Sequence, residues 1–127
     1  MNVDLAPGWT VELDRGPDWL FARLHGPISS DAEGVPLAER LVAMLENEFV
    51  HRLVLELDEI ALLRSPLLGE LVRLHKRVCS RDGVVRICGL SDSNYEVLRS
   101  SRLHDRFPRY TTREEAVLGY RRPNKPR

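Results

Sequence analysis

Hydrophobic and polar residues alternate near the start of the chain. Trp9, Val11 and Leu13 are separated by single polar residues, which is the pattern of a strand with one buried face. Residues 19–25 form a second extended segment, and the sequence RGPD at residues 15–18 has the composition of a turn. Two strands joined by a short turn predict an antiparallel hairpin.

Helical spacing then replaces the alternation. Residues 35–49 place leucine, methionine and phenylalanine at intervals of three and four, with Pro36 suited to the first helical turn. Residues 52–63 are mostly apolar, interrupted by Glu56 and Asp58, which predicts a central strand covered on both faces. Residues 66–80 again show helical spacing and predict a second helix.

The remaining segments continue this order. Residues 84–90 predict a strand, and the polar residues from Ser91 open a helix that extends to about Leu103. A short extended stretch follows at Arg109 and Tyr110, and Thr112 with Glu115 forms a capping box for a last helix. The pattern predicts an α/β fold: a mixed sheet of about four to five strands with an N-terminal hairpin and helices packed against it.

Composition limits the class of protein. The chain has 127 residues, which fits one domain, expected over residues 1–120, followed by a basic, proline-rich tail at 121–127 that we expect to be disordered. Nineteen basic residues balance nineteen acidic ones, which argues against direct binding of nucleic acid. No apolar run approaches the roughly 20 residues needed to span a bilayer, and we expect a cytoplasmic protein without membrane contact.

Few side chains suggest chemistry. Cys79 and Cys88 lie in apolar segments and are expected to be buried, reduced thiols. No pairing partner is evident for the carboxylates at residues 56, 58 and 59, and neither a GxSxG motif nor a phosphate-binding glycine loop is present. We therefore expect no enzyme activity and no cofactor. None of the four histidines has a metal-ligand spacing: His25, His51, His75 and His104.

Ser65 has two interpretations. It stands between Arg64 and Pro66, where an apolar segment ends and a helix begins. A serine at this position can cap the helix through its hydroxyl, a contact whose loss costs about 1 kcal/mol. The same geometry suits a phosphate, which would meet free N–H groups and the positive end of the helix dipole. The residues alone leave both interpretations open.

Several motifs resemble one family. They are RLVLELDEIALLRSPLLGELVRLHKRV from residue 52, VVRICGL from residue 84 and RLHDRFPRYTTREEAVLGY from residue 102. Together with the order of the elements, over about residues 19–120, they resemble the STAS domain, named for sulphate transporters and anti-sigma-factor antagonists. In antagonists of this family, a kinase-type anti-sigma factor with an ATPase-like fold phosphorylates a serine at the start of the helix after the central strand. The resemblance implies that Ser65 is this serine and that the partner holds the ATP.

The same resemblance implies a contact surface for the anti-sigma factor. The residues expected to form it surround the start of the helix: Arg64, Ser65, Pro66, Leu67, Glu70 and Arg73.

The motif itself also departs from the family pattern. Arg64 stands where the family has an acidic residue, Pro66 where it has a small one, and Leu67 where it has glycine. These differences favour an alternative function: a scaffolding STAS module without the phosphoswitch, which assembles with itself as a homodimer or with another signalling protein. A small-ligand-binding or enzymatic domain is a third class, and it would require a pocket.

Overall fold

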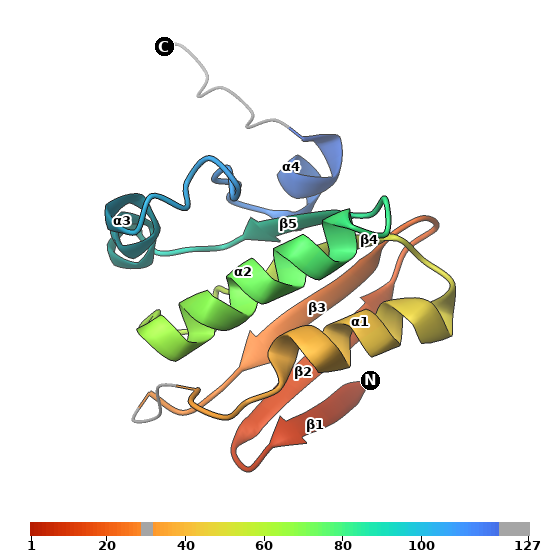
Figure 1. The fold of residues 1–127 in the computed structure, drawn as a ribbon, viewed down its shortest axis with the longest axis horizontal. Coiled ribbons are helices and arrows are strands. Elements are labelled where there is room, and N and C mark those ends of the chain that lie inside the picture. The colour runs from red at the N-terminus through yellow and green to blue at the C-terminus, as the bar shows by residue number, and fades with distance from the viewer. Residues whose placement is uncertain (29–31, 120–127) are drawn as a thin grey trace.

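The computed structural model describes residues 1–28 and 32–119, which form a five-stranded sheet with helices (Figure 1). Its strands, in both chain and spatial order, are β1 (Asn2–Ala6), β2 (Trp9–Arg15), β3 (Leu20–His25), β4 (Arg52–Glu56) and β5 (Val84–Cys88). Strands β1, β2 and β3 pair antiparallel, whereas β3, β4 and β5 pair parallel. The predicted mixed sheet and the β2–β3 hairpin are confirmed.

The first strand was not predicted. β1 carries the alternation Asn2, Val3, Asp4, Leu5, and it is followed by a Pro-Gly turn. The alternating pattern of a strand is therefore present in the sequence, but it covers only five residues. The strand is stable because β2 offers it a hydrogen-bonding edge, and such pairing is not visible in a short segment read alone.

Two long helices pack on one face of the sheet, and a short helix covers part of the other. Figure 1 shows α1 (Leu37–Glu48) and α2 (Ser65–Cys79) side by side across the sheet. Residues of these helices form the main core together with Leu53 and Leu55 of β4. Val54 points to the opposite face, where it packs with Trp19, Cys88 and residues of α4 (Arg113–Leu118) in a second, smaller cluster. The prediction that the central strand is covered on both faces is confirmed.

That strand is shorter than predicted. β4 ends at Glu56, and residues 57–64 form a loop in place of the expected continuous strand. Leu57, Ile60 and Leu63 are buried, but they are spaced three residues apart, and the Ile60 N–H donates to the carbonyl of Leu57 at 3.1 Å. The apolar composition therefore reflects burial of a turn-containing loop, which composition cannot distinguish from a buried strand.

The last elements follow the predicted order. α3 (Asp92–Ser100) is capped by Ser91, and Tyr110 makes a parallel bridge to Cys88. The Thr112 hydroxyl accepts the N–H of Glu115 at 3.2 Å, and the Glu115 carboxylate accepts the N–H of Thr111 at 2.8 Å. This confirms the predicted cap, with the glutamate reaching one residue further back than in a standard capping box. The tail at 121–127 lies outside the described residues.

The parallel strands define the edge at which the candidate site lies. Strands β3, β4 and β5 all end at the same edge, so the segments that follow them gather there (Figure 1). The β4–α2 loop, residues 57–64, delivers the chain to the first turn of α2 at this edge. Among the described residues, no helix is both long and apolar enough to cross a membrane.

Candidate functional site

The Ser65 hydroxyl is not the cap of α2. Arg64 occupies the N-cap position with an extended backbone, and its carbonyl accepts the N–H of Leu68 at 3.0 Å. Ser65 is the first helical residue and Pro66 the second, one position later than predicted. Because the serine lies inside the helix and not at its N-cap, its hydroxyl makes no capping hydrogen bond to the N–H groups of the first turn. The predicted capping role is therefore wrong.

The hydroxyl of Ser65 is exposed and unengaged. It makes no hydrogen bond with any residue in the ranges 1–28 and 32–119. Arg64 beside it is also exposed, and its guanidinium forms no ion pair within the same described ranges. The start of α2 thus presents one free hydroxyl and one free positive charge to solvent.

The other predicted contact residues are placed differently from one another. Pro66 is half-buried beside Ser65. Leu67 is only 1% exposed and belongs to the main core, so its side chain lies beneath the candidate surface rather than on it. Arg73 is exposed and pairs with Glu70, as expected from their spacing.

Glu70 also has a structural role that the sequence did not reveal. One of its carboxylate oxygens accepts the backbone N–H of Ala38 at 2.9 Å, in the first turn of α1. The N-cap residue of α1 is Pro36, whose side chain has no acceptor. Glu70 therefore caps a neighbouring helix, and only the packing of α1 against α2 brings the two groups together.

Gly69 lies one turn after Ser65, on the exposed side of α2. A Cβ atom built at this position would have no neighbouring atom within 4 Å. Glycine in a helix costs roughly 1 kcal/mol relative to alanine, and no packing contact within the described chain requires it here. Its effect is to leave the surface beside Ser65 flat and its backbone accessible.

The loop before Ser65 is anchored by a buried amide. Asn94 of α3 is fully buried, with no exposed surface. Its Oδ1 accepts the N–H of Leu63 at 2.9 Å, and its Nδ2 donates to the carbonyl of Ile60 at 2.9 Å. The sequence analysis missed this residue because a polar residue in the first turn of a helix is usually only a capping or solvated group.

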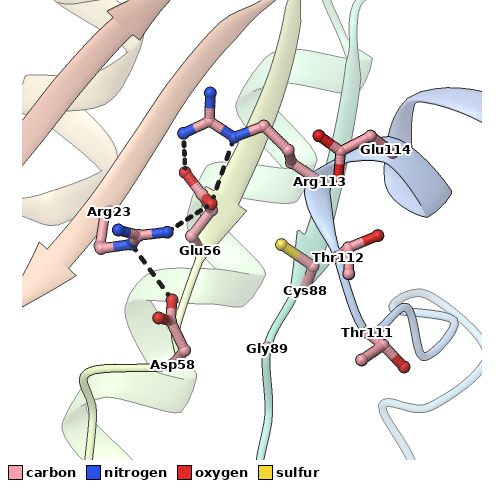
Figure 2. Close-up of a pocket in the computed structure, with 9 residues that line it drawn as sticks. All are labelled: Arg23, Glu56, Asp58, Cys88, Gly89, Thr111, Thr112, Arg113 and Glu114. Carbon is pink, nitrogen blue, oxygen red and sulfur yellow. Dashed lines mark hydrogen bonds and ion pairs between the residues drawn. The ribbon is translucent and has the colours of Figure 1, made fainter.

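A pocket of about 440 Å³ lies on the opposite face of the sheet, at the ends of β4 and β5 (Figure 2). Glu56 is buried there between Arg23 and Arg113, at distances of 3.0 and 2.7 Å, and Arg23 also approaches Asp58 at 3.3 Å. The expectation that these carboxylates lack partners is therefore wrong for Glu56 and Asp58. Their partners come from β3 and α4, far away in the sequence.

The chemistry of this pocket is that of a structural ion network. Burial opposes the charge of Arg113, but its hydrogen bonds to Glu56 and Asp14 outweigh that effect and raise its pKa. Burial, with the charges of Glu56 and Asp58, raises the pKa of the Cys88 thiol to about 12. The thiol is therefore protonated at neutral pH. Since the buried Glu56 pairs with Arg113 of α4 as well as with Arg23 of β3, the network fastens α4 to the sheet.

The two cysteines differ in exposure. Cys88 is buried as predicted, but Cys79 is exposed, at the end of α2 and 3.7 Å from the ring Nε2 of His75. The prediction of a buried thiol is wrong for Cys79 because it lies at the border of the apolar stripe of α2. In the described part of the chain, no group of three or more potential ligands is arranged to hold a metal ion.

Comparison with known proteins supports the interpretation of the fold. The family profile of the STAS domain matches residues 10–116, which is most of the chain. The chain belongs to the STAS domain family. Searching curated protein sequences produced no match to this STAS domain.

Solved structures with the same fold include proteins described as anti-sigma factor antagonists. One from Mycobacterium paratuberculosis has a TM-score of 0.72 at 17% identity, covering 90% of this chain and 96% of that one. An anti-sigma-factor antagonist (STAS) domain protein from Planctomyces limnophilus has a TM-score of 0.68 at 21% identity, with coverage of 86% and 96%. The Bacillus cell fate determinant SpoIIAA in its phosphorylated form has a TM-score of 0.61 at 14% identity, with coverage of 86% and 97%.

Proposed function

We propose that this STAS domain is a non-enzymatic signalling protein that acts as an anti-sigma-factor antagonist. In this proposal it binds a kinase-type anti-sigma factor in the cytoplasm through the start of α2, and phosphorylation of Ser65 ends the interaction. The partner supplies the ATP. The observation that carries the proposal is the exposed, unengaged hydroxyl of Ser65 at the first position of a 15-residue helix.

Gly69 supports a docking surface at this place. An exposed glycine that weakens its own helix and fills no packing need within the described chain is explained by a partner that approaches the backbone closely. Two exposed apolar side chains lie at the same edge of the sheet. Leu62 is 44% exposed in the loop before Ser65, and Ile28 is 70% exposed after β3. These side chains offer the apolar contact that an interface core needs.

Electrostatics favours a phosphate at Ser65. A phosphoserine adds roughly −1.5 to −2 charges at neutral pH, and the first turn of α2 together with the free guanidinium of Arg64 would stabilise it. The same Arg64 would offset part of the phosphate charge toward a partner. We therefore expect Arg64→Asp to strengthen the release of the partner upon phosphorylation.

The first test is a comparative pull-down from lysate of the source organism, read by mass spectrometry. The baits are the wild type, Ser65→Ala and Ser65→Asp. We expect an ATPase-fold kinase to bind the first two and to lose at least tenfold in affinity, about 1.4 kcal/mol, for Ser65→Asp. Ser93→Asp is the matched control, since it adds the same charge to an exposed position in the first turn of α3. Equal binding to all four baits would overturn the proposal.

A second prediction concerns Gly69. Gly69→Ala should raise the free energy of unfolding of the isolated domain by roughly 0.5–1 kcal/mol, because space is open for the methyl group and alanine favours the helix. The same change should weaken binding of the kinase partner severalfold, as the methyl group separates the two backbones. Lys76→Ala, two turns further along α2, is the control. A variant that is more stable and binds equally well would remove Gly69 from the interface.

The alternative function is a scaffolding STAS module without the switch. The residues around Ser65 favour it, because Arg64, Pro66 and Leu67 each depart from the family pattern. Such a module would assemble with itself or with another signalling protein. In the pull-down it would retain the same partners whatever the state of Ser65, so the same experiment separates the two functions.

A further inference from the structure

The loop that leads to Ser65 has few polar ties to the rest of the protein. At its start, the N–H of Leu57 donates to the carbonyl of Cys88 at 2.9 Å, which joins it to β5. At its end, the carbonyl of Arg64 accepts the first helical hydrogen bond of α2. Between these points, within the described part of the chain, Asp58 pairs with Arg23 of β3 at 3.3 Å, and the two hydrogen bonds to Asn94 are the polar contacts that hold the stretch from Ile60 to Leu63.

Asn94 is well suited to hold this segment. Its side-chain oxygen accepts from the N–H of Leu63, and its side-chain nitrogen donates to the carbonyl of Ile60, three residues earlier. Both ends of the amide are thus satisfied although the residue is fully buried. Without it, the buried N–H of Leu63 and the carbonyl of Ile60 would lack partners, at a cost of about 1–3 kcal/mol each.

The amide is itself held in place. Asn94 lies in the first turn of α3, and its backbone N–H donates to the hydroxyl of Ser91 at 3.1 Å. Leu98, one turn further along, is fully buried in the main core. The position of α3 therefore determines the position of the amide, and the amide determines the path of the loop.

The path of the loop determines what the surface presents. With Ile60 and Leu63 directed into the core, at 6% and 2% exposure, Leu62 and Ser65 are directed outward. Only Arg64 separates Leu63, whose N–H is fixed by Asn94, from Ser65. A displacement of the loop would move the start of α2 and the serine together.

We infer that Asn94 is a positioning residue for Ser65: its buried amide fixes the β4–α2 loop and thereby the geometry in which the hydroxyl meets a kinase. This inference rests on the proposed function for its consequence in phosphorylation. Its structural part, the order of the loop, stands independently. It also makes α3 part of the site, although no residue of α3 lies on the contact surface predicted from the sequence.

The test compares Asn94→Ala with Leu98→Ala. Both remove buried side-chain atoms from α3, but only the first removes hydrogen bonds to the loop. All measurements are made where circular dichroism shows each variant to be folded. Hydrogen exchange read by NMR measures the rate for the amide of Leu63 relative to the rates for the core amides of β4. This ratio should increase at least tenfold in Asn94→Ala. It should stay unchanged in Leu98→Ala.

The conservative variant Asn94→Asp sharpens this comparison. A carboxylate keeps the acceptor for the Leu63 N–H but has no donor for the Ile60 carbonyl. When protonated, the acid offers both groups, so protection of Leu63 in Asn94→Asp should increase as the pH falls, while in Asn94→Ala it should not. Protection of Leu63 that is equal in wild type and Asn94→Ala would overturn the inference.

The consequence for Ser65 is measured with the purified kinase recovered with the wild-type bait. If loop disorder depletes the binding-competent conformation, Asn94→Ala should raise the KM for phosphorylation at least tenfold and change kcat less than threefold. Leu98→Ala should change neither by more than twofold. Unchanged kinetics in Asn94→Ala would overturn the positioning role even if the loop is disordered. If the wild type is not phosphorylated, the proposed function is overturned instead. The hydrogen-exchange experiment then still tests whether Asn94 keeps the loop ordered.

Discussion

At the scale of single residues, His75 illustrates how burial changes a titratable group. Its ring packs edge-on against Phe107, with centroids 5.2 Å apart, and it also lies near Cys79. Burial, together with the positive charge of Arg106, lowers the pKa of His75 below its usual value of 6.5. The neutral imidazole is therefore the form that the folded protein favours.

This predicts a pH-dependent contribution to stability. The unfolded chain binds a proton at His75 at a higher pH than the folded chain does, so stability is present above about pH 6.5 and decreases as the pH falls through the folded pKa. Urea unfolding at pH 7.5 and 5.5 measures the effect. The loss of free energy between these values should be smaller for His75→Gln than for the wild type. An equal loss in both would show that other groups cause the acid sensitivity.

At the scale of secondary-structure elements, α4 depends on ion pairs more than on packing. It has six residues, of which Ala116 and Glu115 are buried. Arg113 links it to Glu56 and to Asp14 of β2, and its guanidinium lies 4.3 Å from the ring centroid of Phe21. Arg86 of β5 donates to the carbonyls of Ala116 and Val117 at the end of the helix. Both ends of α4 are thus tied to the sheet by arginine.

Removal of Arg113 should therefore destabilise the domain more than removal of a partly exposed side chain usually does. Arg113→Ala leaves the buried carboxylate of Glu56 with Arg23 as its remaining partner, and we expect a loss of about 2–3 kcal/mol in the free energy of unfolding. Arg99→Ala, which removes an exposed pair with Glu96, should cost less than about 0.5 kcal/mol. Chemical denaturation measures both. Similar losses in the two variants would show that the buried network contributes no more than a surface pair.

At the scale of the whole molecule, the sequence predicts what depends on local patterns. Apart from β1, the order of helices and strands follows from periodicity and turn residues, as do the β2–β3 hairpin and the caps at Ser91 and Thr112, and the structure confirms them. The end of β4 could not be predicted, because burial makes loop residues as apolar as strand residues.

The candidate site likewise has a part that the sequence predicts and a part that it does not. Ser65 could be predicted from its place at the start of a helix and from the family resemblance. Asn94, Glu70 and the arginine partners of Glu56 could not be predicted, because each contact joins segments about 30 or more residues apart. Only the folded sheet and its packed helices bring these groups together. The contacts that hold the site in place are thus less visible in the sequence than the residue that the site presents.

The two faces of the sheet should also differ in how easily they open. The main core joins α1 and α2 to all five strands, whereas the second cluster, within the described residues, has five buried side chains and involves only the six-residue helix α4. Local opening should therefore detach α4 without unfolding the rest, since few buried contacts are lost. Such an opening would expose Cys88, which packs in the second cluster with Ala116.

Labelling of Cys88 measures this opening directly. In a Cys79→Ser background, alkylation of Cys88 in the native state should be slow but nearly independent of low urea concentrations, because opening of α4 exposes little surface. Arg113→Ala should accelerate the labelling at least tenfold by weakening the attachment of α4. Leu45→Ala, which weakens only the main core, should lower the global stability but leave the labelling rate in low urea unchanged. If labelling instead follows global stability in both variants, α4 opens only when the whole sheet unfolds, and the two faces form one cooperative unit.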